Sequence, residues 1–310
     1  MPRLAWSPAA RQLFAAQAGG VAVLRQRPGA GGQFHEVACR SLSPRAGRCG
    51  ARPEEPVAIS SSPDGRDIYV ATAHRVTVLR VDARSGALRF GGCLGDGSPA
   101  QDGVQCAARI PGQSGFFEIV FTPDGRTGFM ASGGRLVVLG RAAGGALRYR
   151  GCAGPSGSGC RRRAPTVSRR WLAIDTTGRD LYTAAGRLMH FRVSPRTGDP
   201  AYRECYGGPG TSCAQLLWPG FSANGPLALA RDSRRLAALR SNGGALAVFT
   251  RSAVTGRLSP YACGGGCGGL GLLPLVVVPT ALLPGPGGTF IATAFSTSGG
   301  GGLLAQLRGS

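Results

Sequence analysis

Residues 62–70 read Ser62-Pro63-Asp64-Gly65-Arg66-Asp67-Ile68-Tyr69-Val70, a turn followed by a short apolar run. Closely similar stretches occupy residues 122–130 and 175–183, and weaker copies begin near residues 7, 231 and 284. Proline fixes φ and glycine accepts a positive φ, so each copy predicts a tight turn between two strands. The copies recur about every 55 residues, a period typical of repeat arrays and propellers.

Four short runs rich in Val, Leu and aromatic residues accompany each turn. Residues 119–121 precede a turn, residues 68–71 follow one, and residues 76–79 and 86–90 supply the third and fourth runs. Runs of this length, bounded by Gly, Pro and Asp, are typical of strands and too short for a helical repeat. Four antiparallel strands per repeat predict one blade of a β-propeller.

We therefore predict an all-β fold in which residues 1–310 form a single β-propeller domain of six four-stranded blades. The expected blades cover approximately residues 1–52, 53–112, 113–166, 167–222, 223–272 and 273–310. The last unit has no fourth run, so we expect the last of the six blades to be incomplete.

All ten cysteines lie just after the fourth run, and five of the six units carry a pair. The repeat selects five local bridges: Cys39–Cys49, Cys93–Cys106, Cys152–Cys160, Cys205–Cys213 and Cys263–Cys267. Each bridge would stabilise the fold by about 2–3 kcal/mol. Zinc needs four converging ligands, whereas isolated pairs on different blades diverge, so we predict disulfides and no metal.

Paired cysteines favour an oxidising compartment, and we predict an extracellular or cell-envelope location. Residues 1–6 have no apolar core, so no signal peptide is visible there. The most apolar segment, residues 270–283, is interrupted by Pro274 and Pro279 and is too short for a transmembrane helix.

The chain resembles the lactonase-type propellers, which are also known for YVTN-type repeats, and in particular an exported bacterial subset with Gly-Cys…Cys loops. The resemblance is carried by residues 62–71, 76–79 and 85–88 and by Gly92-Cys93. It covers nearly the whole chain and implies a propeller fold of seven blades, which leaves open the alternative that the chain is a truncated seven-bladed propeller. It also allows a lactonase-like activity of the 6-phosphogluconolactonase type, but its motifs are turns and strands and identify no catalytic residue.

The chain carries a net charge of +21, and all of its 36 basic residues are arginines. The absence of Lys excludes a P-loop lysine and Schiff-base chemistry. Guanidinium groups suit phosphate, sulfate and carboxylate ligands. The arginines are scattered rather than confined to one stripe, however, which favours a coding bias toward Arg as the explanation of the composition. The ligand-binding candidates form one basic cluster beside an aromatic residue: Arg161, Arg162, Arg163, Arg169, Arg170 and Trp171. The alternative for this cluster is a solvated basic loop.

Candidates for catalysis are few. His35, His74 and His190 lie in different units with no evident partner, and we expect ordinary surface or strand histidines. Only His74, in the loop between a second and a third strand on the cysteine-loop face, is a candidate general base. Glu118, which opens an inner strand, is a second weak candidate, and a cation site at Asp96 and Asp102 is a further alternative.

The leading prediction is a non-catalytic exported scaffold or binding module whose disulfide-rigidified, Arg-rich face engages a protein or an acidic carbohydrate. We expect a monomer without cofactor, and nucleic acid is not an expected partner. A lactonase-like hydrolase is the first alternative, and a protein that binds acidic polysaccharides or other polyanions is the second.

Overall fold

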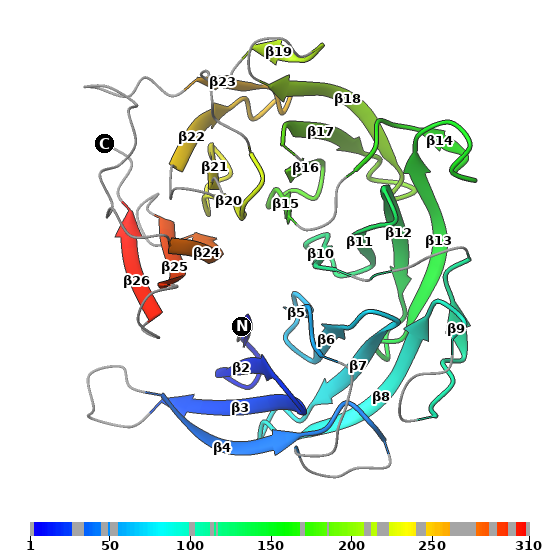
Figure 1. Cartoon of the computed structure of the whole chain (residues 1–310), viewed down its shortest axis with the longest axis vertical. Coiled ribbons are helices and arrows are strands. Elements are labelled where there is room, and N and C mark those ends of the chain that lie inside the picture. The colour runs from blue at the N-terminus through cyan, green and yellow to red at the C-terminus, as the bar shows by residue number, and fades with distance from the viewer. Residues whose placement is uncertain are drawn as a thin grey trace. The chain divides into compact units, whose positions relative to one another are not determined.

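Strands and turns make up the part of the chain that the structure describes (Figure 1). The computed structural model describes residues 3–26, 34–44, 49, 55–98, 103–111, 115, 117–167, 171–184, 186–207, 212–215, 223–239, 246–260, 277–284, 290–296 and 302–307. Within these residues no helix is long and apolar enough to cross a membrane. The chain divides into two compact units, Met1–Cys152 and Ala153–Ser310.

The first unit begins with a four-stranded sheet, ordered as in the sequence: β1 (Arg3–Ser7), β2 (Gln12–Gln17), β3 (Gly20–Gln26) and β4 (Phe34–Arg40). The second sheet contains β5 (Ala58–Ser61), β6 (Asp67–Ala71), β7 (Arg75–Val81), β8 (Leu88–Gly95) and β9 (Ala108–Arg109). The third contains β10 (Ile119–Phe121), β11 (Thr127–Ser132), β12 (Arg135–Arg141), β13 (Leu147–Gly154) and β14 (Arg162–Arg163). The division between the two units falls within β13.

The second unit continues the pattern. Its first sheet contains β15 (Trp171–Ile174), β16 (Asp180–Ala184), β17 (Leu188–Val193), β18 (Pro200–Gly207) and β19 (Ala214–Gln215). Its second contains β20 (Leu227–Leu229), β21 (Arg235–Leu239), β22 (Leu246–Arg251) and β23 (Leu258–Pro260). Its third contains β24 (Val277–Pro284), β25 (Phe290–Ser296) and β26 (Gly302–Leu307). Each sheet lies within the bounds of one predicted repeat, and among the described residues the last sheet has three strands.

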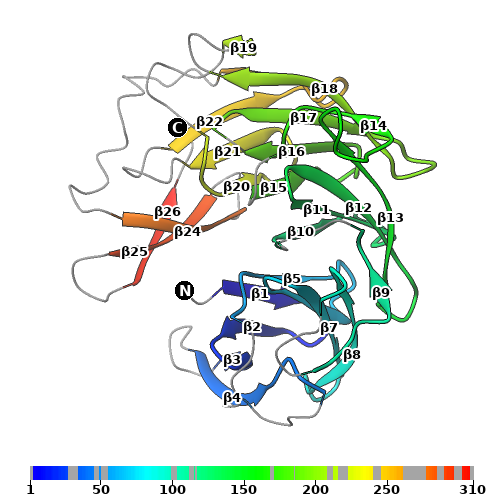
Figure 2. The same cartoon turned by 45° about the vertical axis from the view of Figure 1, so that its right-hand side comes forward.

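A short fifth strand was not predicted. In three sheets the chain runs through the cysteine loop and returns parallel to the fourth strand, as β9, β14 and β19 (Figure 2). The first cysteine of each pair lies in the fourth strand, and the second lies two residues or less before the fifth strand. The fifth strand therefore fixes the cysteine loop along the outer edge of its blade.

The predicted turns have the expected backbone. Gly65, Gly125 and Gly178 take φ angles of 67°, 67° and 70°. A Cβ at Gly65 would approach the backbone nitrogen of Ala9 to 2.7 Å, so this turn packs against the preceding blade. In the copy at residues 231–234, Ser233 takes the glycine's place at φ 55°. Its buried hydroxyl accepts a hydrogen bond from the backbone of Thr176 at 3.0 Å, which joins two blades.

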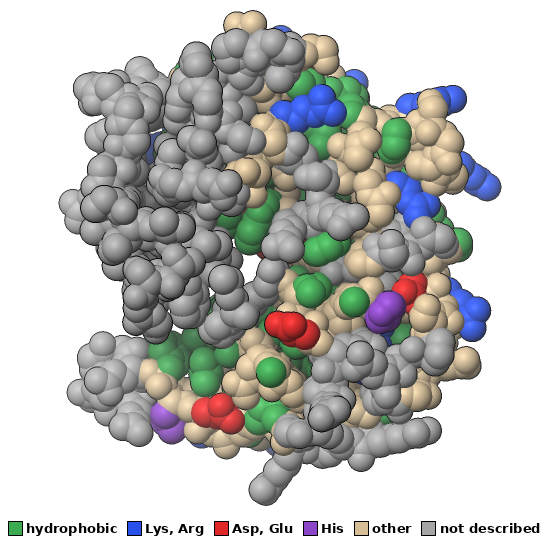
Figure 3. Space-filling model, in the orientation of Figure 1, with side chains coloured by type: hydrophobic (Ala, Val, Ile, Leu, Met, Phe, Trp, Pro, Cys, Tyr) green, Lys and Arg blue, Asp and Glu red, His purple; other side chains and the backbone are tan. Residues whose placement is uncertain are grey.

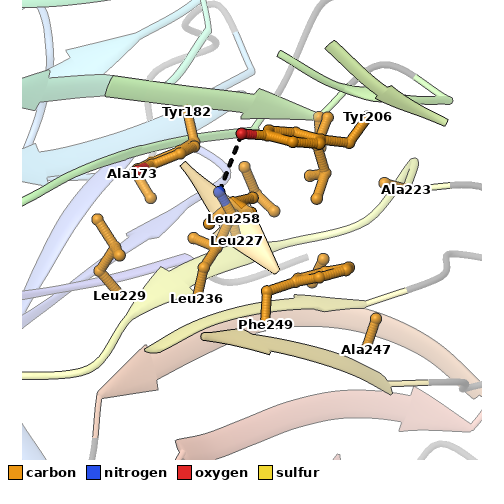
Figure 4. Close-up of a cluster of buried hydrophobic side chains, with 13 residues drawn as sticks. Ala173, Tyr182, Tyr206, Ala223, Leu227, Leu229, Leu236, Ala247, Phe249 and Leu258 are labelled. Carbon is orange, nitrogen blue, oxygen red and sulfur yellow. Dashed lines mark hydrogen bonds between the residues drawn. The ribbon is translucent and has the colours of Figure 1, made fainter. Parts of the chain in front are cut away.

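Apolar side chains of neighbouring sheets pack together within each unit. One cluster joins β15–β18 to β20–β23 and contains Tyr182, Tyr206, Leu236 and Phe249 (Figure 4). The backbone N–H of Leu258 donates to the buried hydroxyl of Tyr206 at 2.9 Å, so the tyrosine's polar atom has a partner inside the cluster. The burial of apolar area between blades is the main stabilising contribution.

Candidate functional site

The cysteine loops contain the predicted bridges. The structure joins Cys39 to Cys49, Cys93 to Cys106 and Cys205 to Cys213. Cys152 and Cys160 are also disulfide-bonded, whereas Cys263 and Cys267 lie outside the described residues. Among the described residues, no group of three or more His, Cys, Asp or Glu side chains is arranged so that it could hold a metal ion, and Asp102 lies outside these residues.

His74 has a partner that the sequence analysis did not find. It lies between β6 and β7, and its Nδ1 is 3.0 Å from Oδ2 of Asp96 in the cysteine loop after β8. The His74 side chain is 48% exposed, whereas that of Asp96 is only 7% exposed. The backbone N–H of Asp96 donates to the carbonyl of His74, so two hydrogen bonds tie the loops together. The ring is therefore held through one nitrogen and reaches solvent.

The electrostatics of Asp96 keep it ionised. Partial burial alone would raise the pKa of this carboxyl, but hydrogen bonds from His74 and Ser98 outweigh burial and hold the pKa below its ordinary value. A carboxylate on Nδ1 selects the imidazole tautomer that has its free lone pair on Nε2. The pair is thus arranged so that Nε2 can accept a proton from a bound water or hydroxyl group.

Two further groups lie near this pair. The side chain of Arg109, on β9, lies against the loop of Asp96, since a Cβ at Gly97 would be 3.7 Å from its Nη1. Gly115 donates to the carbonyl of Ala73 at 3.1 Å, which places the segment before β10 beside the His74 loop. Glu118 lies in that segment and is half-buried.

The predicted arginine cluster is only partly assembled in the described residues. Arg162 forms an ion pair with Asp199, and Arg163 donates to the hydroxyl of Ser156. The indole Nε1 of Trp171 donates to the carbonyl of Asn224 at 3.2 Å. Arg169 and Arg170 lie outside the described residues. On the face drawn in Figure 3, basic side chains are scattered over the described surface rather than gathered in one patch.

A buried polar cluster joins the second and third sheets. The guanidinium of Arg141 on β12 contacts Asp64 at 2.9 Å and Asp67 at 2.5 Å. Its Nε donates to the hydroxyl of Tyr69, which in turn donates to the carbonyl of Gly145 at 2.9 Å. Asp64 also accepts the backbone N–H of Arg66, which is the turn role expected for it.

The second unit repeats this cluster between its first two sheets. Arg251 on β22 contacts Asp175 at 2.9 Å and also contacts Asp180, and its Nε lies 3.1 Å from the Tyr182 hydroxyl. Arg251 and both carboxylates are almost completely buried. Burial raises the pKa of Tyr182, which therefore stays neutral.

His190, on β17, belongs to the same cluster, which corrects the expectation of a histidine without partners. Its Nε2 is 2.8 Å from Asp180 and its Nδ1 is 3.4 Å from Glu204. The ring stacks on Tyr182 with centroids 5.0 Å apart, and its side chain is 1% exposed. Since carboxylates engage both nitrogens, neither is available to a substrate.

Comparisons with known proteins give the fold. The structure is similar to that of the periplasmic gluconolactonase PpgL of Pseudomonas aeruginosa, with 18% identity, a TM-score of 0.61, and coverage of 99% of this chain and 88% of that one. It is also similar to a candidate 6-phosphogluconolactonase of Bacteroides fragilis, with 15% identity, a TM-score of 0.61, and coverage of 99% and 82%. The β-propeller domain of Cps50 (Swd1) from Myceliophteria thermophila matches with 14% identity, a TM-score of 0.56, and coverage of 94% and 80%. No protein-family model and no curated protein matches the chain.

The chain therefore has the β-propeller fold, and its structural neighbours include lactonase-type propellers. These similarities confirm the predicted propeller fold and the resemblance to lactonase-type propellers.

Proposed function

We propose that the protein is an exported hydrolase that opens a sugar-sized lactone, with His74 as its general base. The observation that carries this proposal is the pair formed by a half-exposed histidine and a nearly buried carboxylate 3.0 Å away. The lactonase names of two structural neighbours support the substrate class, and the bridged cysteines support export. This proposal takes up the alternative of the sequence analysis rather than its leading prediction.

The chemistry follows from the atoms present. Nε2 of His74 accepts a proton from water as its oxygen forms a bond to the lactone carbonyl carbon. Asp96 stabilises the resulting imidazolium through Nδ1. The tetrahedral intermediate then collapses, the ring C–O bond breaks, and the imidazolium returns the proton to the departing ring oxygen. The hydroxy acid formed leaves His74 neutral again.

Arg109 is the group suited to the developing negative charge. Its guanidinium lies against the Asp96 loop and makes no ion pair with any residue that the structure describes. A preorganised cation near a carbonyl oxygen stabilises the oxyanion more than it stabilises the neutral carbonyl. Arg109 is also able to bind the carboxylate that forms when the lactone ring opens.

The test is a panel of gluconolactone and related sugar and acyl lactones, with hydrolysis measured above the spontaneous rate. We expect His74→Ala and Asp96→Asn to lower kcat/KM by about 100-fold or more. His35→Ala, in another blade, is the matched control and is expected to retain activity. Melting temperatures of all variants show whether each is folded. A wild-type protein inactive on every lactone, or a fully active His74→Ala variant, contradicts the proposal.

A second candidate is a non-catalytic binding module for acidic carbohydrates. It is favoured by the rigid cysteine loop before Arg161, which is closed at Cys160 and anchored by β14. Arg161→Ala together with Arg163→Ala is expected to lower the salt concentration needed to elute the protein from heparin. The double variant Arg84→Ala/Arg89→Ala removes the same charge elsewhere, and equal effects of the two pairs contradict a specific site.

A further inference from the structure

Two adjoining cavities open on the second unit, beside the strands β17 and β18. One has a volume of about 410 Å³ and the other of about 380 Å³. They share Arg192 and Arg203 in their linings. Arg179 and Asp199 line the first cavity, and Arg257 and Glu204 line the second. Four arginines thus line the two cavities, which together we call the arginine groove.

Two of these arginines are held in place by carboxylates. Arg192 donates twice to Asp180, at 2.9 and 3.0 Å, and Asp180 is fully buried. Arg257 donates through Nε to Glu204 at 3.2 Å. Hydrogen bonds from His190, Arg192 and Arg251 outweigh the effect of burial and lower the pKa of Asp180 to about 2, so this anchor stays ionised. These contacts orient guanidinium groups before any ligand arrives.

The other two arginines have no such partners. The side chains of Arg179 and Arg203 are exposed and form no hydrogen bond or ion pair with any side chain that the structure describes. Arg203 is the extra residue of a β-bulge, since Phe191 pairs with Tyr202 while His190 pairs with Glu204. A bulge redirects the side chain that it frees from the ladder. The second sheet carries Gly91 at the corresponding bulge.

Comparison of the sheet of β15–β19 with that of β5–β9 shows that His190 and Glu204, which both line the groove, have no counterparts in the earlier sheet. Tyr182 on β16 pairs with His190 on β17, which in turn pairs with Glu204 on β18. The equivalent Tyr69 on β6 pairs with Val78 on β7, which in turn pairs with Gly92 on β8. Burying a histidine between two carboxylates costs free energy of desolvation. The earlier sheet forms with Val78 at this position, so the fold itself does not require the histidine. Such local departures from the needs of the fold are expected at functional sites.

We propose that the arginine groove binds a small oxyanion, namely a phosphate or sulfate group carried by a sugar-sized molecule. Guanidinium groups bind such groups with paired, charge-assisted hydrogen bonds. Thr255 also lines the groove, and its hydroxyl, which accepts the backbone N–H of Arg257 at 3.3 Å, has a proton that it can donate. The site lies in the other compact unit from His74, and the proposal does not depend on the lactonase activity.

The test uses the whole protein and inorganic phosphate and sulfate as probes, with binding measured by calorimetry at constant ionic strength in chloride. We expect saturable binding that weakens about tenfold in Arg203→Ala and in Arg179→Ala. Arg89→Ala, which removes an exposed arginine from β8, is expected to bind as the wild type does. Glu204→Gln is expected to tighten binding, because it removes a negative charge from the groove, whereas Glu36→Gln on β4 makes the same charge change without effect.

Each outcome decides the matter. Weaker anion binding in Arg203→Ala and Arg179→Ala, with binding by Arg89→Ala and Glu36→Gln unchanged, supports the site. This result holds whether or not any lactone is hydrolysed. No saturable binding by the wild type, or equal weakening by Arg203→Ala and Arg89→Ala, overturns it. The order of affinity between phosphate and sulfate then indicates which ester the groove prefers.

Discussion

The Nε of Arg141 donates a hydrogen bond of 2.8 Å to the hydroxyl of Tyr69, although 72 residues separate them in the sequence. The equivalent atoms of Arg251 and Tyr182 lie 3.1 Å apart in the second unit. The fold thus places the same guanidinium–phenol–carboxylate cluster at two blade junctions, and its energetics can be measured at each.

Replacement of Arg251 by Met should be strongly destabilising. The change leaves Asp175 and Asp180 buried without their shared cation, and breaking a buried pair in this way costs about 3–5 kcal/mol. The free energy of unfolding by urea measures the loss. Arg234→Met, at an exposed position in the same blade, is the matched control and should change stability by less than about 0.5 kcal/mol. Equal losses in the two variants would contradict the assigned role.

Replacement of Tyr69 by Phe tests the hydroxyl alone. The phenol donates to Gly145 and accepts from Arg141, so its removal leaves two buried partners unsatisfied and should cost about 1–2 kcal/mol. A double-mutant cycle with Arg141→Met should show a coupling energy between about 0.5 and 3 kcal/mol. Additive losses would mean that the two side chains act independently.

Acid should weaken the second unit through Asp180. Its pKa is lowered from 3.8 to about 2 in the folded protein, so the unfolded state binds a proton first as the pH falls. The stabilisation of about 2 kcal/mol is fully present above pH 4 and is lost as the pH falls from about 4 through 2. Unfolding measured in urea from pH 6 to pH 2 should show this decline. In Asp180→Asn, which starts less stable, this part of the pH dependence should be absent.

The bridge between Cys93 and Cys106 should affect both stability and catalysis. Its replacement by two serines opens a loop of 13 residues and should cost about 3 kcal/mol. That loop also holds Asp96 against His74, so lactone hydrolysis should fall even at temperatures where the variant is fully folded. The Cys205→Ser/Cys213→Ser variant should lose stability without this loss of activity. Equal lactone hydrolysis by the two double-serine variants would contradict a role of the Cys93–Cys106 bridge in positioning Asp96 against His74.

The repeat made the strands predictable. Residues 9–18 are rich in alanine, yet β2 forms there because the position in the repeat outweighs local helix propensity. The turn at residues 62–67 and the local cysteine pairing followed from the same comparison of copies. The fifth strands were missed because two-residue segments such as Ala108–Arg109 leave no periodic pattern.

The partners of the polar side chains were not predictable from single positions. His74 reaches Asp96 because Arg75 pairs with Gly95 at the end of β7 and β8, which sets the next residues of the two strands opposite each other. That register includes a shift between Val78 and Leu79, which the sequence does not reveal. A finer comparison of the copies could have found the blade clusters. Val81, Arg141, Val193 and Arg251 are equivalent, since each backbone N–H donates to the carbonyl of the turn arginine before its second strand. Of these four positions, the two that carry arginine lie in the blades that follow Tyr69 and Tyr182.

This alternation bears on how blades of nearly equal shape find their correct neighbours. Any such blade offers a similar edge to every other, and misassembly between like modules is a common failure of repeat proteins. Exchange of the repeats that contain β12 and β17 would set Val193, in place of Arg141, against Asp67 and Tyr69, leaving a carboxylate stranded in an apolar seam. Matched charge at these two seams therefore disfavours every order in which Asp67 or Asp180 faces a blade without the arginine. A gene in which the repeats of β12 and β17 are exchanged should yield insoluble protein even though every strand is retained.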